Sequence, residues 1–145
     1  MFGELIDILK KNPKKIVFTE GSDPRILEAA SRLLAGTFLS PILVGNKDEI
    51  AKAAEESAFN IRGAMILDPL EYEEIDEMAE CLYEIRKNKG MTLEKAKETC
   101  RQANYFGTML VKMGKADALL GGATYSTADT VRPALGRILW LPALF

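Results

Sequence analysis

Short apolar runs alternate with amphipathic segments along most of this chain. Four compact apolar runs predict β-strands, at residues 15–19, 41–45, 64–68 and 117–120. The segments around them carry apolar residues at helical spacing and predict helices, at residues 4–11, 24–35, 48–57, 72–88 and 93–113. Strands that are apolar throughout are typical of a parallel sheet that is buried on both faces. We therefore expect an α/β fold, a mostly parallel sheet with helices on both faces in three layers.

The last predicted strand leads into a stretch of small and hydroxyl-bearing residues that runs from Gly121 to Pro133. Because ligands of open parallel sheets bind beyond the carboxyl ends of the strands, this stretch is the sharpest candidate site. Pro133 is tolerated in the first turn of a helix, so we expect a helix that begins near Asp129 or Thr130 and is capped by one of them. Arg132 would then lie in the first turn, where the helix dipole disfavours a cation. An anionic substrate at the helix mouth would explain this arginine, and so would solvation or an ion pair with Asp129.

The same stretch offers hydroxyl groups on Ser126, Thr127 and Thr130. Small residues before them let a ligand approach the backbone, and the following helix start supplies free amide groups. We expect these hydroxyls to add hydrogen bonds to an anion bound there.

Two further stretches have plainer explanations. Residues 19–25 follow the first strand and predict a turn in which Asp23 caps the next helix. Arg86 belongs to a basic cluster, residues 86–90, which by itself indicates a solvated helix end. Neither the GxGxxG fingerprint of dinucleotide sites nor the GxxxxGK[ST] phosphate loop occurs in the sequence.

The composition narrows the possible chemistry. The 145 residues include no histidine, which excludes a Ser-His-Asp triad, a Cys-His pair and any histidine zinc site within them. The two cysteines, Cys81 and Cys100, are interpreted as buried reduced thiols. A net charge of −2 gives no basic surface for nucleic acid, and no apolar run is long enough to span a membrane. We therefore expect a cytoplasmic protein with neither nucleic acid nor membrane as its partner.

Several segments, taken in order, resemble the phosphate acetyltransferase and butyryltransferase family. They are KKIVFTEGSDPRILEAASRLL, PILVGNKDEI, YEIRKNKGMTLEKA, ANYFGTMLVKMGKADALLGGA and GGATYSTADTVRPAL. The EIRKNKGMT piece favours the acetyl enzyme over the butyryl one. Three positions depart from the family pattern: Thr19 stands where proline is common, Gly121 where serine is usual, and Tyr125 where histidine is usual.

The resemblance implies a two-domain enzyme, usually a homodimer, that moves an acetyl group between acetyl-CoA and inorganic phosphate. It assigns Arg86 and Arg132 to contacts with CoA or the phosphate group, and guanidinium groups suit such anions. Ser126, Thr127 and Thr130 are the further substrate-binding candidates. The catalytic serine, arginine and aspartate of the family belong to its carboxyl-terminal part, so no catalytic residue is expected among these 145. CoA is a substrate, and the resemblance implies neither a metal nor another cofactor.

The end of the chain departs most from the family. We expect residues 1–145 to be the amino-terminal α/β domain of such an enzyme, apparently truncated, with residues 136–145 as an atypical apolar tail. By itself this chain is expected to be inactive. Two alternatives stay open: a non-catalytic acyl-CoA-binding or regulatory module of the same fold, and a phosphate butyryltransferase. The related isocitrate and isopropylmalate dehydrogenase architecture is disfavoured, because its set of metal-binding aspartates is not apparent in the sequence.

Overall fold

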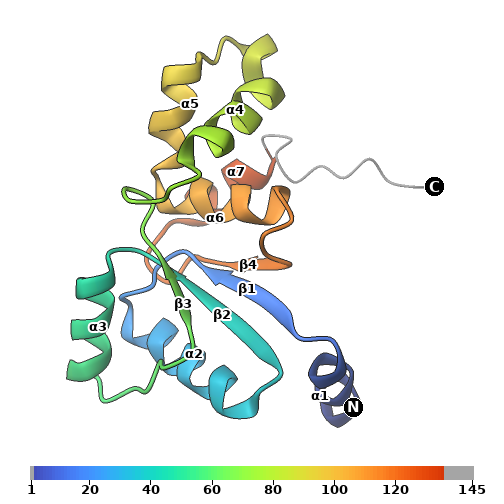
Figure 1. Ribbon diagram of the computed structural model, residues 1–145, viewed down its shortest axis with the longest axis vertical. Coiled ribbons are helices and arrows are strands. Elements are labelled where there is room, and N and C mark those ends of the chain that lie inside the picture. The colour runs from blue at the N-terminus through green and yellow to red at the C-terminus, as the bar shows by residue number, and fades with distance from the viewer. Residues whose placement is uncertain (1, 136–145) are drawn as a thin grey trace.

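The computed structural model describes residues 2–135 of the chain (Figure 1). Within them the helices are α1 (Phe2–Lys11), α2 (Pro24–Gly36), α3 (Lys47–Glu56), α4 (Ile75–Arg86), α5 (Leu93–Cys100), α6 (Ala103–Lys112) and α7 (Thr127–Pro133). A single 3₁₀ turn, η1 (Lys87–Lys89), follows α4. The strands are β1 (Lys14–Phe18), β2 (Leu39–Val44), β3 (Met65–Leu67) and β4 (Ala118–Leu120). The predicted apolar tail, residues 136–145, lies outside the described residues.

The four strands form one parallel sheet in the order β3-β2-β1-β4. In its register, Val17 of β1 lies between Ile42 of β2 and Leu119 of β4. This confirms the predicted α/β class, and all four predicted strands occur within two residues of their expected limits. The strands could be predicted because each carries a short apolar run, and those of the central strands β1 and β2 are buried on both faces of the sheet.

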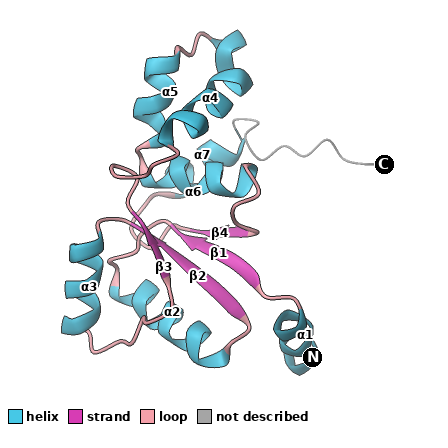
Figure 2. Ribbon diagram, in the orientation of Figure 1, coloured by secondary structure: helices cyan, strands magenta, loops and turns pink. Residues whose placement is uncertain are grey.

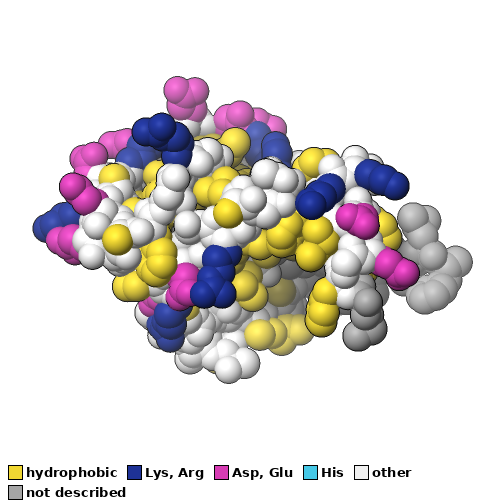
Figure 3. Space-filling model, turned by 90° about the horizontal axis from the view of Figure 1, so that it is seen from below, with side chains coloured by type: hydrophobic (Ala, Val, Ile, Leu, Met, Phe, Trp, Pro, Cys, Tyr) yellow, Lys and Arg dark blue, Asp and Glu magenta, His cyan; other side chains and the backbone are white. Residues whose placement is uncertain are grey.

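Helices cover both faces of the sheet (Figure 2). Successive strand residues point to opposite faces, so Val17 packs with residues of α4, α5 and α6. Its neighbour Phe18 packs with Ile26 and Leu27 of α2 and with Ile50 of α3. The expected three layers are therefore confirmed. On the face seen from below, acidic and basic side chains are interspersed around apolar ones (Figure 3).

The predicted helix 93–113 is wrong as a single element. The chain turns at Arg101 and Gln102, which separates α5 from α6. The two helices have different partners: α5 lies beside α4, whereas α6 lies directly on the sheet (Figure 1). At Gly107 of α6, an added Cβ would come within 2.8 Å of the Thr19 side chain. One straight helix cannot serve both contacts, although its apolar spacing continues across the break.

The acidic helix predicted at residues 72–88 is shorter than expected. It begins at Ile75, after a turn in which Asp68 accepts a hydrogen bond from the Leu70 amide at 2.9 Å. It ends at Arg86, and the η1 turn leads to Gly90 with a φ of 80°. The glycine tolerates this left-handed backbone and ends the segment, as predicted. The result places Arg86 at the end of a helix that stands above the sheet (Figure 1).

Candidate functional site

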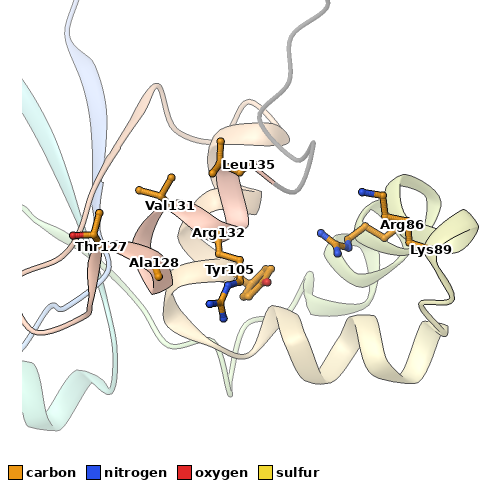
Figure 4. A pocket seen from close by; sticks show the side chains of 8 residues that line it. All are labelled: Arg86, Lys89, Tyr105, Thr127, Ala128, Val131, Arg132 and Leu135. Atoms are coloured by element: carbon orange, nitrogen blue, oxygen red, sulfur yellow. The ribbon is translucent and has the colours of Figure 1, made fainter.

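A cavity of about 650 Å³ lies between the end of α4 and the last described helix, α7 (Figure 4). We call it the arginine pocket. Its lining residues come from α4, η1, α6 and α7 and continue just past α7; they are Arg86, Lys89, Tyr105, Thr127, Ala128, Val131, Arg132 and Leu135. Arg86 points from the end of α4 toward the side of the pocket on which Tyr105 and Arg132 lie (Figure 4). Arg86 and Arg132 lie 46 positions apart in the sequence, and the fold brings them to one pocket.

Helix α7 begins earlier than the sequence suggested. Its cap is Ser126, whose Oγ accepts the Asp129 amide proton at 3.2 Å and donates to the Asp129 carboxylate at 2.7 Å. Through the first of these bonds Ser126 acts as the N-cap, and the helix starts at Thr127. The prediction of Asp129 or Thr130 as the cap is therefore wrong. It relied on Pro133 being in the first turn, whereas Pro133 is the last residue of α7.

Arg132 consequently lies in the last turn of α7 and not in the first. A cation is favoured there by the helix dipole, so the argument from a disfavoured charge does not hold. Its guanidinium lies 3.9 Å from the Asp129 carboxylate, which is a loose, exposed ion pair. The position of Arg132 in the pocket, opposite Arg86, remains the observation that points to an anion site.

The last residue of α7 is a proline, and the neighbouring helix compensates for the amide proton that it lacks. Pro133 has no amide proton for the carbonyl oxygen of Asp129, four residues earlier. Asn104 of α6 supplies the missing donor, because its Nδ2 lies 2.8 Å from that oxygen. The Oδ1 of Asn104 accepts the Tyr105 amide proton at 2.9 Å. This side chain therefore joins α7 to the segment that carries Tyr105 into the arginine pocket.

The two stretches that follow β1 and β4 lie next to each other. Glu20 is buried, and its carboxylate accepts hydrogen bonds from the amides of Gly122, Thr124 and Tyr125, at 3.0, 2.9 and 3.4 Å. A second cavity, of about 370 Å³, opens here at the carboxyl ends of β1 and β2. We call it the strand-end pocket; its lining includes residues 19–23, Thr124 and Tyr125.

Electrostatics at the strand-end pocket follow from its two carboxylates. The side-chain hydrogen bonds from Arg25 hold the pKa of Asp23 below its usual value. Asp23 also caps α2, accepting the Arg25 amide proton at 2.9 Å, as predicted. Burial raises the pKa of Tyr125, and the nearby charge of Glu20 raises it further. The phenol therefore stays protonated at neutral pH.

Neither cysteine has the character of a nucleophile. Cys100 is buried in the core beneath α4, and burial raises its pKa to about 12. Cys81 is half-buried, and burial also raises its pKa. Thiolates are the reactive form, so both groups are inert thiols at neutral pH. The expectation of reduced thiols is confirmed, with Cys81 less buried than expected.

Residues 2–135 contain no group of three or more His, Cys, Asp or Glu side chains that is suited to hold a metal ion. The helices of the same range are too short or too polar to cross a membrane.

Comparison with known proteins decides the family. The model of the Phosphate acetyl/butaryl transferase family matches residues 1–143. The chain belongs to this family. Among curated phosphate acetyltransferases, it is 51% identical over 130 residues to that of Thermoanaerobacterium thermosaccharolyticum, covering 90% of this chain and 39% of the relative. It is 50% identical to that of Bacillus subtilis, covering 83% of this chain and 37% of the relative.

Solved structures of phosphotransacetylases have the same fold. The structure from Streptococcus pyogenes aligns with a TM-score of 0.87 and 45% identity, covering 93% of this chain and 41% of that chain. The EutD phosphotransacetylase from Staphylococcus aureus aligns with a TM-score of 0.85 and 39% identity, covering 99% of this chain and 44% of that chain. This transferase-family chain therefore spans about two fifths of the length of the relatives it matches.

In this member of the transferase family, the substrate-binding candidates named from the sequence have two different structural roles. Ser126 and Thr130 are engaged in the start of α7, where the Thr130 hydroxyl donates to the Ser126 carbonyl oxygen at 3.2 Å. Thr127 and Arg132 line the arginine pocket together with Arg86. The role of all five residues in binding substrate stays a prediction, as do the homodimer and the cytoplasmic location.

Sequence reasoning did not find three residues that shape these pockets. Lys89 lies three positions after Arg86, a helical spacing that would have placed both on one side. No spacing in the sequence indicates Tyr105, because it comes close to Arg132 only through the packing of two helices. Glu20 was visible only as a carboxylate directly after an apolar strand.

Proposed function

We propose that these residues form the substrate-binding part of a phosphate acetyltransferase, which transfers an acetyl group between CoA and inorganic phosphate. The observation that carries the proposal is that Arg86, Lys89 and Arg132 line one pocket. Both substrates are anions with several oxygen acceptors. Guanidinium groups bind such oxygens through paired, charge-assisted hydrogen bonds.

The rest of the arginine pocket supports CoA as the larger ligand. Tyr105, Val131 and Leu135 add aromatic and apolar surface beside the cations. CoA combines phosphate groups with an aromatic base and a long, weakly polar arm. A pocket that offers both kinds of surface suits such a molecule better than it suits free phosphate alone.

The proposed reaction needs no redox step. In one direction the CoA thiolate attacks the carbonyl carbon of acetyl phosphate, a C–S bond forms, and the C–O bond to phosphate breaks. Phosphate leaves with the bonding electron pair, and the reverse direction uses phosphate as the nucleophile. The cations would hold the phosphate groups of the substrates in place and offset their charge, which orients the two reactants.

The described lining of the arginine pocket contains cations, a phenol and a threonine but no carboxylate. It therefore offers no ordinary base to take the proton from the CoA thiol. We accordingly expect the 145-residue chain by itself to bind CoA without turning it over. CoA release from acetyl-CoA and phosphate checks this, with the complete phosphate acetyltransferase of Bacillus subtilis as positive control. Turnover within about tenfold of that control would contradict the expectation.

Calorimetric titration of CoA into the purified chain tests the binding proposal. Arg132→Ala should raise the dissociation constant by about tenfold to a hundredfold, the equivalent of about 1.5–3 kcal/mol for a lost charge-assisted contact. Arg32→Ala is the matched control, because Arg32 is an exposed arginine of α2 that pairs with Glu28. Equal affinities of the wild type and Arg132→Ala would refute the assignment. Equal losses of affinity in both variants would show a general effect of the protein's charge and not a contact made by Arg132.

A further inference from the structure

Glu20 is a buried carboxylate that the proposed reaction does not use. It lies two residues after the end of β1, and only 8% of the residue is exposed. Its Oε1 accepts the amide protons of Gly122 and Tyr125, and its Oε2 accepts that of Thr124. These donors lie more than a hundred positions away in the sequence. A buried charge is costly unless such bonds compensate it, so the arrangement has a specific structural consequence.

The chemistry of the contact requires a carboxylate. An ionised glutamate presents two oxygens that only accept, and here both face backbone donors. A glutamine would replace one of them by an NH₂ group and aim its protons at a backbone N–H. An aspartate is shorter by one methylene group and would not reach both sides of the loop. The three amides are thus held by a group that has no equivalent substitute.

The turn that contains Glu20 also holds a carbonyl group of the 122–125 segment. Arg25 donates through Nη2 to the carbonyl oxygen of Ala123 at 2.7 Å. Its own orientation is fixed by Asp23, which accepts from Nε at 2.9 Å and from Nη2 at 2.8 Å. Glu20 and Arg25 therefore bind donors and acceptors of one short segment, residues 122–125. We call this set of contacts the Glu20 clamp.

The Glu20 clamp lies immediately before α7. The residue after the clamped segment is Ser126, the cap of α7, and the next is Thr127, which lines the arginine pocket. The clamp therefore holds the segment from which α7 leaves the sheet, directly before the Ser126 cap. Arg132 lies in the last turn of the same short helix.

We propose that Glu20 is a positioning residue for the arginine pocket, acting through the 122–125 segment on the placement of Thr127 and Arg132. The proposal rests on the proposed binding of CoA in that pocket. It gives the turn after β1 a task in ligand binding, although none of its residues lines the arginine pocket.

The test compares three variants of the chain. Glu20→Gln keeps the shape of the side chain and removes one acceptor. Arg25→Met removes the contact with Ala123 and the exposed ion pair with Asp23, whereas the Arg25 amide still bonds the Asp23 cap, so this variant should fold. Glu28→Gln is the control, since it removes a carboxylate of α2 that pairs with Arg32 on the exposed surface. For each, amide resonances are recorded by nuclear magnetic resonance, and CoA affinity is measured by calorimetry.

The proposal predicts that Glu20→Gln moves the amide resonances of Gly122, Thr124 and Thr127 and weakens CoA binding by at least about tenfold. Arg25→Met should change both in the same direction by less, and Glu28→Gln should change neither. Shifted resonances with wild-type affinity would overturn the proposal, as would weakened binding with unmoved resonances. If Glu20→Gln does not fold, Arg25→Met decides by the same two criteria.

The design separates this inference from the function on which it rests. A wild-type chain that does not bind CoA would refute the proposed function alone. The clamp would then be judged by the resonances of Thr127 and Arg132 in the two clamp variants. Unmoved resonances there would overturn the positioning role as well, and moved ones would support it.

Discussion

The Oγ1 of Thr19 lies 2.6 Å from the point that a Cβ atom would occupy at Gly121. The Thr19 side chain is buried, and its methyl group faces Gly107 of α6, where a Cβ would come within 2.8 Å of it. The threonine side chain therefore fills the space that a residue larger than glycine would need at position 121.

Gly121→Ala should therefore destabilise the chain, by about 1–3 kcal/mol in the free energy of unfolding, because the added methyl group overpacks a closed site. In a Thr19→Ala background the same substitution should cost much less. Urea denaturation of the two single variants and the double variant gives the coupling energy. Strictly additive changes would show that the two positions are independent.

The contact between Asn104 and Asp129 leads to a second coupling. Asn104→Ala should lower the free energy of unfolding by about 1–3 kcal/mol, because the Asp129 carbonyl oxygen loses the donor that replaces the absent amide of Pro133. Pro133→Ala would restore a backbone donor, so Asn104→Ala should cost less in that background. Thermal unfolding of the four proteins measures this. An equal cost in both backgrounds would contradict the compensation.

Cys100 predicts how stability changes at alkaline pH. Burial raises its pKa from 9.0 to about 12, so the folded state holds this proton more tightly than the unfolded chain does. The resulting stability is present in full below about pH 9 and is lost as the pH rises toward 12. From this group the free energy of unfolding should fall by up to about 1.4 kcal/mol per pH unit.

Cys100→Ala removes this contribution, although the smaller side chain lowers stability at every pH. The slope of stability against pH should therefore be shallower in the variant above about pH 9. Some slope should remain, because burial also raises the pKa values of Cys81, Tyr72 and Tyr125. Urea denaturation at several pH values measures both slopes, and parallel curves would contradict the role of Cys100.

The sheet was predictable because each strand is a closed apolar run between turn residues. The break between α5 and α6 was not, since the apolar spacing continues through Arg101 and only the separate partners of the two helices require a turn. The start of α7 was placed too late for a related reason. Pro133 indicates a helix start close before it, whereas Ser126 caps α7 by accepting the Asp129 amide proton, and the compensation by Asn104 is a tertiary contact.

The sequence predicted the cations of the candidate site but not the hydrogen bonds that hold the neighbouring segment in place. Arg86 and Arg132 were identified through the family resemblance, and the structure places both at one pocket. The Glu20 clamp depends on hydrogen bonds between segments about a hundred positions apart. No local pattern reports such a contact, because a single carboxylate after a strand is compatible with many turns.

A crystal structure of the chain with CoA tests the central claim most directly. The account predicts phosphate oxygens of CoA within about 3 Å of the guanidinium nitrogens of both Arg86 and Arg132, with the ligand seated in the arginine pocket. Only the wild-type chain is needed, and soaking with inorganic phosphate serves as the comparison. Well-ordered CoA bound at another surface, with both arginines facing away from its phosphates, would contradict the account.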